Sequence, residues 1–191
     1  IGLRFQKDPT KDPNDFLIHV RLKDQEARLQ QETIGIIGTN LMHACFTESN
    51  PKTILKRLYD NLTIDNFEID MVEAIGPDFE NIDNRLLSLT LVKERMTNAV
   101  IFTPEGKNKY PSDILHKKNI LTLRGSFRPV TKVNIDMLTE GLNKFKKNKK
   151  VDENNIQLLL EITLSNLMTN GQVDERDFLD RADILCSLGY T

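Results

Sequence analysis

Short apolar segments and amphipathic segments alternate along most of the chain. Residues 16–22 alternate between apolar and polar, which is typical of a half-buried strand. The compact apolar run at 33–38 is typical of a strand that is buried on both faces. Apolar residues at helical spacing after Pro51 and after Asp83 indicate amphipathic helices. The whole pattern predicts strands over 16–22, 33–38, 67–74, 99–102, 119–123 and 156–164, and helices over 51–62, 83–94, 134–145 and 174–188.

Two stretches do not fit a single strand or helix. Residues 103–118 carry Pro and Gly among polar residues and are predicted to form a long connection. The stretch from Ile156 leaves two alternatives open, a buried strand followed by a short helix, or one helix that continues to Gly171. The first alternative is favoured because it keeps the alternation of strands and helices.

The order of these elements predicts the fold class. Strands that alternate with helices indicate an α/β fold with a mostly parallel, Rossmann-like sheet flanked by helices. Residues 1–32 are predicted to be an N-terminal extension with one strand, and residues 33–191 an α/β domain. That domain is expected to be truncated at its C-terminal end, because Tyr190 and Thr191 follow the last helix as a strand would.

Charge and cysteine content narrow the function classes. The formal net charge is −2, without the basic excess that phosphate neutralisation demands, so nucleic-acid binding is not predicted. Two cysteines outside any CxxC pair indicate a reducing compartment, so we expect a cytoplasmic protein. The chain has no apolar run of the length that spans a membrane, and its three histidines lack the spacing of a metal site.

The loop after the strand at 119–123 is the best candidate for a binding site. It combines two arginines, a glycine and two hydroxyls ahead of a helix N-terminus, and such groups bind a phosphate or carboxylate. The alternative is an ordinary loop whose arginines pair with neighbouring carboxylates, and both interpretations stay open. The predicted ligand-binding residues are Arg124, Ser126, Arg128 and Thr131, with Lys118 and Arg85 as assisting cations.

Acidic residues follow the strand at 67–74. Glu73 and Asp78 are weak candidates for acid–base catalysis, because carboxylates at the mouth of a sheet can serve as bases. Asp83 is better explained as the cap of the next helix. The glycines at 35 and 38 match neither GxGxxG nor a P-loop, so close packing explains them better than phosphate binding.

Four stretches of the chain resemble a family of long, poorly characterised bacterial cytoplasmic proteins. Members of that family sometimes carry the labels nicotinate-nucleotide adenylyltransferase or TonB-dependent receptor. The HxGH-type motif of such an adenylyltransferase has no counterpart here, where its position reads Gly38-Thr39-Asn40-Leu41. The resemblance therefore implies cytoplasmic relatives and a longer chain, but no mechanism. It covers nearly the whole sequence, chiefly residues 34–46, 82–102, 111–138 and 177–191.

Two functions follow as expectations. The first is an enzyme or sensor that binds a small phosphate-bearing, nucleotide-like molecule at the carboxyl ends of the strands. The second is a non-catalytic structural or partner-binding module that forms a homo-oligomer. In that case the sheet end and the lysine-rich segment 144–150 would contact another chain.

Overall fold

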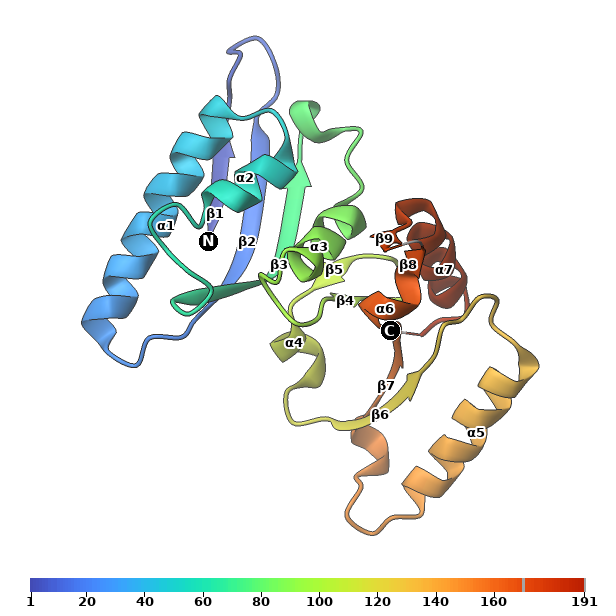
Figure 1. The fold of residues 1–191 in the computed structure, drawn as a ribbon. Coiled ribbons are helices and arrows are strands. Elements are labelled where there is room, and N and C mark those ends of the chain that lie inside the picture. The colour runs from blue at the N-terminus through green and yellow to red at the C-terminus, as the bar shows by residue number, and fades with distance from the viewer. Residues whose placement is uncertain (170, 191) are drawn as a thin grey trace. The chain divides into compact units, whose positions relative to one another are not determined.

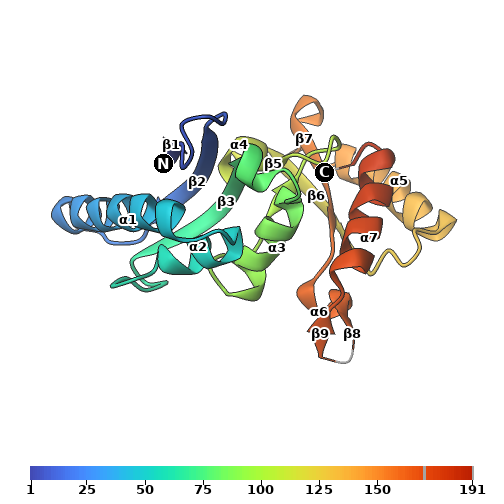
Figure 2. The same cartoon turned by 90° about the horizontal axis from the view of Figure 1, so that it is seen from above.

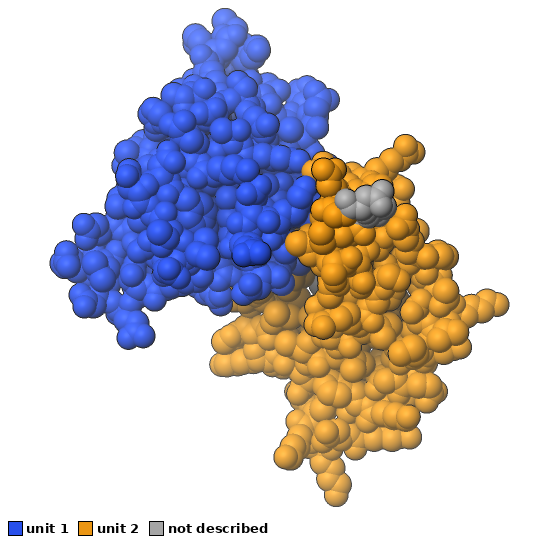
Figure 3. Space-filling view, viewed as in Figure 1, with its two compact units in different colours: residues 1–100 blue, residues 101–191 orange. Residues whose placement is uncertain are grey.

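The computed structural model describes residues 1–169 and 171–190. The chain divides into two compact units, Ile1–Val100 and Ile101–Thr191, which Figure 3 shows in separate colours. Each unit has its own sheet and helices, and each is described by itself.

The first unit is built on a three-stranded antiparallel sheet. Its strands β1 (Gly2–Phe5), β2 (Asn14–Leu22) and β3 (Phe67–Ile75) are ordered β1-β2-β3. The register shifts between His19 and Val20, which is a β-bulge in the pairing of β2 with β3. The strand predicted at 16–22 is therefore confirmed, and so is the strand predicted at 67–74.

Helix α1 (Ala27–Thr47) contains the segment 33–38, so the strand predicted there is wrong. Ile37 belongs to a buried helical stripe that continues for two more turns, and burial of that stripe overrides the strand propensity of the isoleucines in this segment. The boundary proposed between residues 32 and 33 falls inside this helix. The buried residues of the stripe are Thr33, Ile37, Leu41, Ala44 and Cys45.

Two further helices begin where local chemistry predicts. In α2 (Pro51–Arg57), the side chain of Asn50 accepts a hydrogen bond from the backbone nitrogen of Lys52 at 2.9 Å. In α3 (Asn84–Lys93), the side chain of Asp83 caps the first turn. The predictions of a helix after Asn50 and of a capping role for Asp83 are confirmed.

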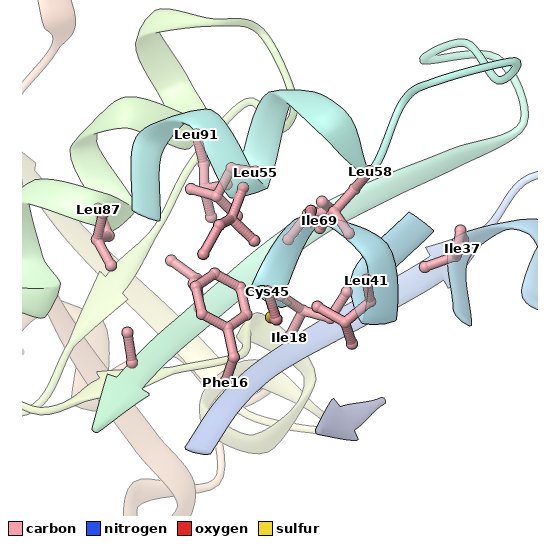
Figure 4. Packing of buried hydrophobic residues seen from close by; sticks show 14 of the residues in the cluster. Phe16, Ile18, Ile37, Leu41, Cys45, Leu55, Leu58, Ile69, Leu87 and Leu91 are labelled. Atoms are coloured by element: carbon pink, nitrogen blue, oxygen red, sulfur yellow. The ribbon is translucent and has the colours of Figure 1, made fainter. Parts of the chain in front are cut away.

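The helices of the first unit lie on one face of its sheet. In Figures 1 and 2, α1 and α2 lie side by side, with α1 against β1 and β2 and α3 against β3. Figure 4 shows the core between these layers, where side chains from α1, α2, α3 and the strands meet. Its fully buried members include Phe16, Ile37, Leu41, Leu55, Leu58, Phe67, Ile69, Leu87 and Leu91. The opposite face of the sheet carries mostly polar and charged side chains, together with the exposed Leu17.

The second unit contains a parallel strand pair joined by a helix. Strands β6 (Asn119–Arg124) and β7 (Ile156–Glu161) are parallel, and α5 (Lys132–Lys146) forms the crossover between them. The register places Arg124 opposite Glu161 at the carboxyl ends of both strands. The short helix α6 (Leu164–Leu167) follows β7, so the favoured alternative for this stretch is confirmed.

Short elements make up the rest of the second unit. The stretch 103–118 is more ordered than predicted, since it contains a strand and a short helix. The last helix is confirmed, with Asp174 as its cap and Gly189 beyond its end at φ 77°. Thr191, part of the predicted terminal strand, lies outside the described residues. The elements are β4 (Ile101–Phe102), β5 (Asn108–Lys109), α4 (Pro111–Leu115), β8 (Met168–Thr169), β9 (Gln172–Val173) and α7 (Glu175–Ser187), with the 3-10 turn η2 (Glu153–Asn155). The other 3-10 turn, η1 (Pro77–Phe79), follows β3 in the first unit.

The prediction of a mostly parallel, Rossmann-like sheet is wrong. The three-stranded sheet is antiparallel, and in the described part of the chain the parallel pairing is confined to β6 with β7. The antiparallel pairing of β2 with β3 results from the path of the chain between them. Helix α1 leads the chain away from the end of β2, and α2 with the following turn leads it back, so β3 starts where β2 stopped (Figure 1).

Candidate functional site

The loop 125–131 lies at the carboxyl ends of β6 and β7, but Arg124 before it and Arg128 within it both have carboxylate partners. A nitrogen of Arg124 lies 2.9 Å from an oxygen of Glu161. The Nε of Arg128 lies 3.2 Å from an oxygen of Asp177. The arginine side chains are still 66% and 58% exposed. The geometry of the loop therefore matches the ordinary-loop alternative, with the arginines tied to neighbouring acids.

A buried arginine that the sequence analysis did not select holds this loop in place. The guanidinium of Arg181, on α7, is only 3% exposed and donates 2.9 Å hydrogen bonds to the carbonyls of Ser126 and Asn166. It also pairs with Asp177 one turn earlier on the same helix. The spacing of Asp177 and Arg181 was a visible signal, whereas the two carbonyl contacts depend on tertiary structure.

The hydroxyl of Thr131 serves the start of α5. The backbone nitrogen of Asn134 donates to this hydroxyl at 3.4 Å, and the backbone nitrogen of Thr131 donates to the side-chain oxygen of Asn134 at 2.8 Å. This reciprocal pair is a capping box. Thr131 is therefore the N-cap, so α5 begins two residues before the predicted start at 134, and the Thr131 side chain is already engaged.

The other predicted cations are not brought to this loop. Lys118 precedes β6, so it lies at the opposite end of the strand, about 20 Å along the chain from Arg124. Arg85 belongs to the first unit, where its guanidinium hydrogen-bonds to Asp83 at distances of 2.8 to 3.3 Å. Hydrogen bonds from Arg85 also hold the pKa of Asp83 below its ordinary value. The structure thus brings four of the six predicted ligand-binding residues to the loop 125–131 and its edges, and leaves Lys118 and Arg85 elsewhere.

The two acidic candidates lie in the first unit. Glu73 is half-buried on β3. Asp78 is fixed by the buried Asn14, whose Nδ2 donates to the Asp78 carboxylate at 3.1 Å and whose Oδ1 accepts from the Asp78 backbone nitrogen at 2.9 Å. This reciprocal pairing gives Asp78 a structural role at the turn after β3.

A cavity of about 480 Å³ opens beside this turn. Asp12 and Glu80 contribute carboxylates to its lining, and Ile75 contributes an exposed apolar side chain. One wall is fixed by Asn84, whose side-chain amide bonds both the nitrogen and the oxygen of Ala74, at 2.8 and 3.1 Å. The cavity has few convergent polar groups, so it does not define a ligand class.

A cluster of charges on the polar face of the first sheet was also missed. The Nδ1 of His19 lies 2.6 Å from a carboxylate oxygen of Asp70. Arg21 pairs with Glu68, and the hydroxyl of Thr97 donates to Glu68 at 2.6 Å. Burial raises the pKa of Glu68, but these hydrogen bonds outweigh it and hold the pKa below its ordinary value. Alternating charged positions in two predicted strands were the available signal.

Helix α1 presents apolar residues on its outer side as well as on its buried side. Ile34, Met42 and Phe46 are 45%, 52% and 56% exposed. A methyl group added to Gly35 or Gly38 would meet no described atom within 4 Å outside the local backbone. We call these five residues the α1 face. The prediction of a strand at 33–38 concealed this surface, because it assigned these glycines and Ile34 to a buried sheet.

Two further findings concern the described residues. They contain no group of three or more His, Cys, Asp or Glu side chains arranged to hold a metal ion. Of the helices they form, none is both long and apolar enough to cross a membrane.

Comparison with known proteins gives no relative: no protein-family model, curated protein or solved structure matches the chain.

Proposed function

We propose that this chain is a protein-interaction module whose contact surface is the α1 face. The observation that carries the proposal is the exposure of three large apolar side chains, Ile34, Met42 and Phe46, that follow one another along a 21-residue helix. Contiguous apolar patches on a protein surface mark sites of association, whereas single exposed apolar residues are common and carry no such meaning.

The spacing on the helix makes these residues one surface. Ile34, Gly38, Met42 and Phe46 recur at every fourth position, so they form a continuous stripe along α1. The helix forms the outer margin of the first unit in Figure 1. The two glycines add to the stripe because they let the backbone of a partner approach closely.

The buried side of α1 fixes the orientation of the helix. Ile37, Leu41, Ala44 and Cys45 are at most 2% exposed and lie in the core of the first unit (Figure 4). The helix therefore has no freedom to turn its outer apolar residues inward. A partner that covers them is the remaining way to remove their apolar surface from water.

Site-specific photocrosslinking in cells tests this proposal. A photoreactive amino acid at Met42 is expected to give a protein adduct, because that position faces the partner. The matched control is Ile64, which is 47% exposed and lies in the turn before β3, away from α1. An adduct at Met42 and none at Ile64 supports the proposal. Equal yields at both positions, or none at either, would refute it.

A second candidate function is the binding of a small phosphate-bearing molecule at loop 125–131. The exposure of the Arg124 and Arg128 side chains favours it, because exposed ion pairs contribute little and an anion can replace their carboxylates. A thermal-shift screen with nucleotides, sugar phosphates and inorganic phosphate tests it. A ligand that raises the midpoint of the wild type but not of Arg124→Ala or Arg128→Ala supports this function, and an equal shift in all three proteins excludes the loop.

The proposal includes a cytoplasmic location. Neither Cys45 nor Cys186 forms a disulfide, which agrees with a reducing compartment. Membership of the bacterial family that the sequence resembles stays a prediction.

A further inference from the structure

We propose that the second unit carries a binding surface for a nucleic-acid duplex, which it contacts through the phosphate backbone rather than the bases. The surface lies at the amino ends of β6 and β7, in the other unit from the α1 face, so it goes beyond the proposed function. It is formed by seven exposed lysines from two separate segments of the chain. We call them the basic pole: Lys117, Lys118, Lys144, Lys146, Lys147, Lys149 and Lys150.

The fold of the second unit brings these two segments together. Helix α5 runs back along β6, so the residues after the helix return to the start of that strand (Figure 1). There the side-chain nitrogen of Asn155 donates a hydrogen bond to the carbonyl of Lys117 at 2.6 Å. The side-chain nitrogen of Asn119 likewise donates to the carbonyl of Asp152 at 3.3 Å. The lysines of both segments therefore belong to one end of the unit.

The charge of the basic pole is not balanced within the described part of the protein. Among those residues, no carboxylate lies within ion-pairing distance of any of the seven ammonium groups. The nearby Asp152 is engaged as a cap, because its side chain accepts a hydrogen bond from the backbone nitrogen of Asn154 at 3.0 Å. Like charges that lie close together repel one another, and a polyanion relieves this repulsion. The formal net charge of −2 conceals the surface, because most of the acidic residues lie elsewhere in the chain.

The dipole of α5 accounts for only part of this charge. Lysines in the last turn of a helix stabilise its C-terminus, which explains Lys144 and Lys146. The effect is confined to that turn, whereas Lys149 and Lys150 lie beyond it and residues 117–118 belong to another segment. Stabilisation of the helix therefore does not explain why all seven lysines gather at this end of the unit.

The kinds of residue at the basic pole favour a phosphate backbone as the partner. Lysine ammonium groups contact phosphates as point charges, and a cluster of them binds a duplex without reading its sequence. Single-strand binding uses exposed aromatic rings, whereas Phe145, the ring in this segment, is half-buried. A membrane surface also attracts lysines, but the exposed apolar side chain beside the pole is that of Ile120, a single residue that offers little to insert into lipid.

Fluorescence anisotropy of the full chain with labelled duplexes tests this proposal. Wild type is expected to bind DNA duplexes of unrelated sequence with similar affinity at low salt. The logarithm of the binding constant should fall linearly with the logarithm of the salt concentration. Its slope should be about −4 to −6, because about five to seven lysines each displace about 0.9 of a counterion. Duplex RNA of the same sequence is measured in parallel and shows which of the two backbones binds more tightly.

Paired substitutions test whether both segments contact the same duplex. Lys117→Gln with Lys118→Gln should make the slope shallower by about two, and so should Lys149→Gln with Lys150→Gln, since each lost phosphate contact removes about one. These side chains are exposed, so their replacement leaves the fold intact.

The matched control is Lys11→Gln with Lys132→Gln, which removes two exposed lysines outside the basic pole and should bind as wild type does. The proposal is overturned if the chain binds neither duplex at low salt, if the paired variants keep the slope of the wild type, or if the control loses as much as they do. Binding to polyglutamate, or to vesicles that contain phosphatidylserine, at least as tightly as to a duplex would also overturn it. That result would assign the surface to an acidic protein or to an anionic membrane.

Discussion

Replacing Arg181 by methionine should destabilise the second unit far more than an ordinary helix substitution does. The buried guanidinium joins three parts of that unit, because it donates to the carbonyl of Ser126 in the loop after β6, to the carbonyl of Asn166 in α6, and to the carboxylate of Asp177 in α7. Arg181→Met keeps much of the side-chain volume but removes every donor. Two carbonyls and one carboxylate oxygen then lose this partner.

The magnitude follows from these contacts. A buried acceptor left without a donor costs about 1–3 kcal/mol, and removing one partner of a buried ion pair costs about 3–5 kcal/mol. Asp177 is 15% exposed and keeps its contact with Arg128, so its loss is reduced. We therefore expect Arg181→Met to lower the free energy of unfolding by about 3 kcal/mol, within a range of about 3 to 5 kcal/mol.

Native-state hydrogen exchange of the full chain measures this loss residue by residue. Amides of β6, β7 and α7 should exchange faster in Arg181→Met. The control Arg176→Met changes an exposed arginine on the same helix and should stay within about 0.5 kcal/mol of wild type. A loss below about 1 kcal/mol in Arg181→Met, or an equal loss in both variants, would refute the role given to the buried guanidinium.

Three further predictions concern the pH response, the thiols and the turn after β3. The free energy of unfolding should fall as the pH drops through the lowered pKa of Glu68, because the ionised carboxylate stabilises the fold and the protonated one does not. Urea titrations at several pH values should show a smaller decline for Glu68→Gln than for wild type. Burial raises the pKa of Cys45 to about 11, so its thiol should react slowly with an alkylating reagent. Mass spectrometry should find Cys186 labelled first in the native protein and both cysteines labelled in urea. Rapid labelling of Cys45 in the native protein would contradict this. Gly76→Ala should lower the free energy of unfolding in urea by about 2–4 kcal/mol, because φ is 124° and the new methyl group would lie 2.6 Å from an amide oxygen. Gly189→Ala, where φ is also positive but the new methyl group meets open space, should lower it by about 1 kcal/mol. Equal losses in the two variants would refute the contribution of the contact.

Helix starts were the part of the fold that sequence patterns predicted well. Asp83 and Asp174 cap the helices that follow them, and the helix after Asn50 begins at Pro51. These features depend on one side chain and the backbone two or three residues later, so the sequence contains the whole interaction.

Strand direction and the role of the segment 33–38 depend on distant parts of the chain. A short apolar run fits a buried strand or a buried helix equally well, and only the continuation of the stripe to Leu41 and Cys45 identifies the helix. The pairing of β2 with β3 is antiparallel because of the path taken by the residues between them, which local patterns do not specify.

The candidate loop was placed correctly at the carboxyl end of a strand, but its chemistry was only partly predictable. Arg124 and Arg128 find their acidic partners in Glu161 and Asp177, which are more than thirty residues away in the sequence. No local pattern shows such pairs in advance. The same reasoning explains why Arg181 was missed.

The oxidation of methionine in the native protein tests the α1 face most directly. Met42 and Met137 are 52% and 56% exposed in one copy of the chain, so dilute protein treated with peroxide should form sulfoxide at similar rates at both positions. In intact cells, where the partner is present, Met42 should become protected while Met137 continues to react, as mass spectrometry of the peptides would show. Equal oxidation of both methionines in purified protein and in cells alike would contradict an interaction through this face.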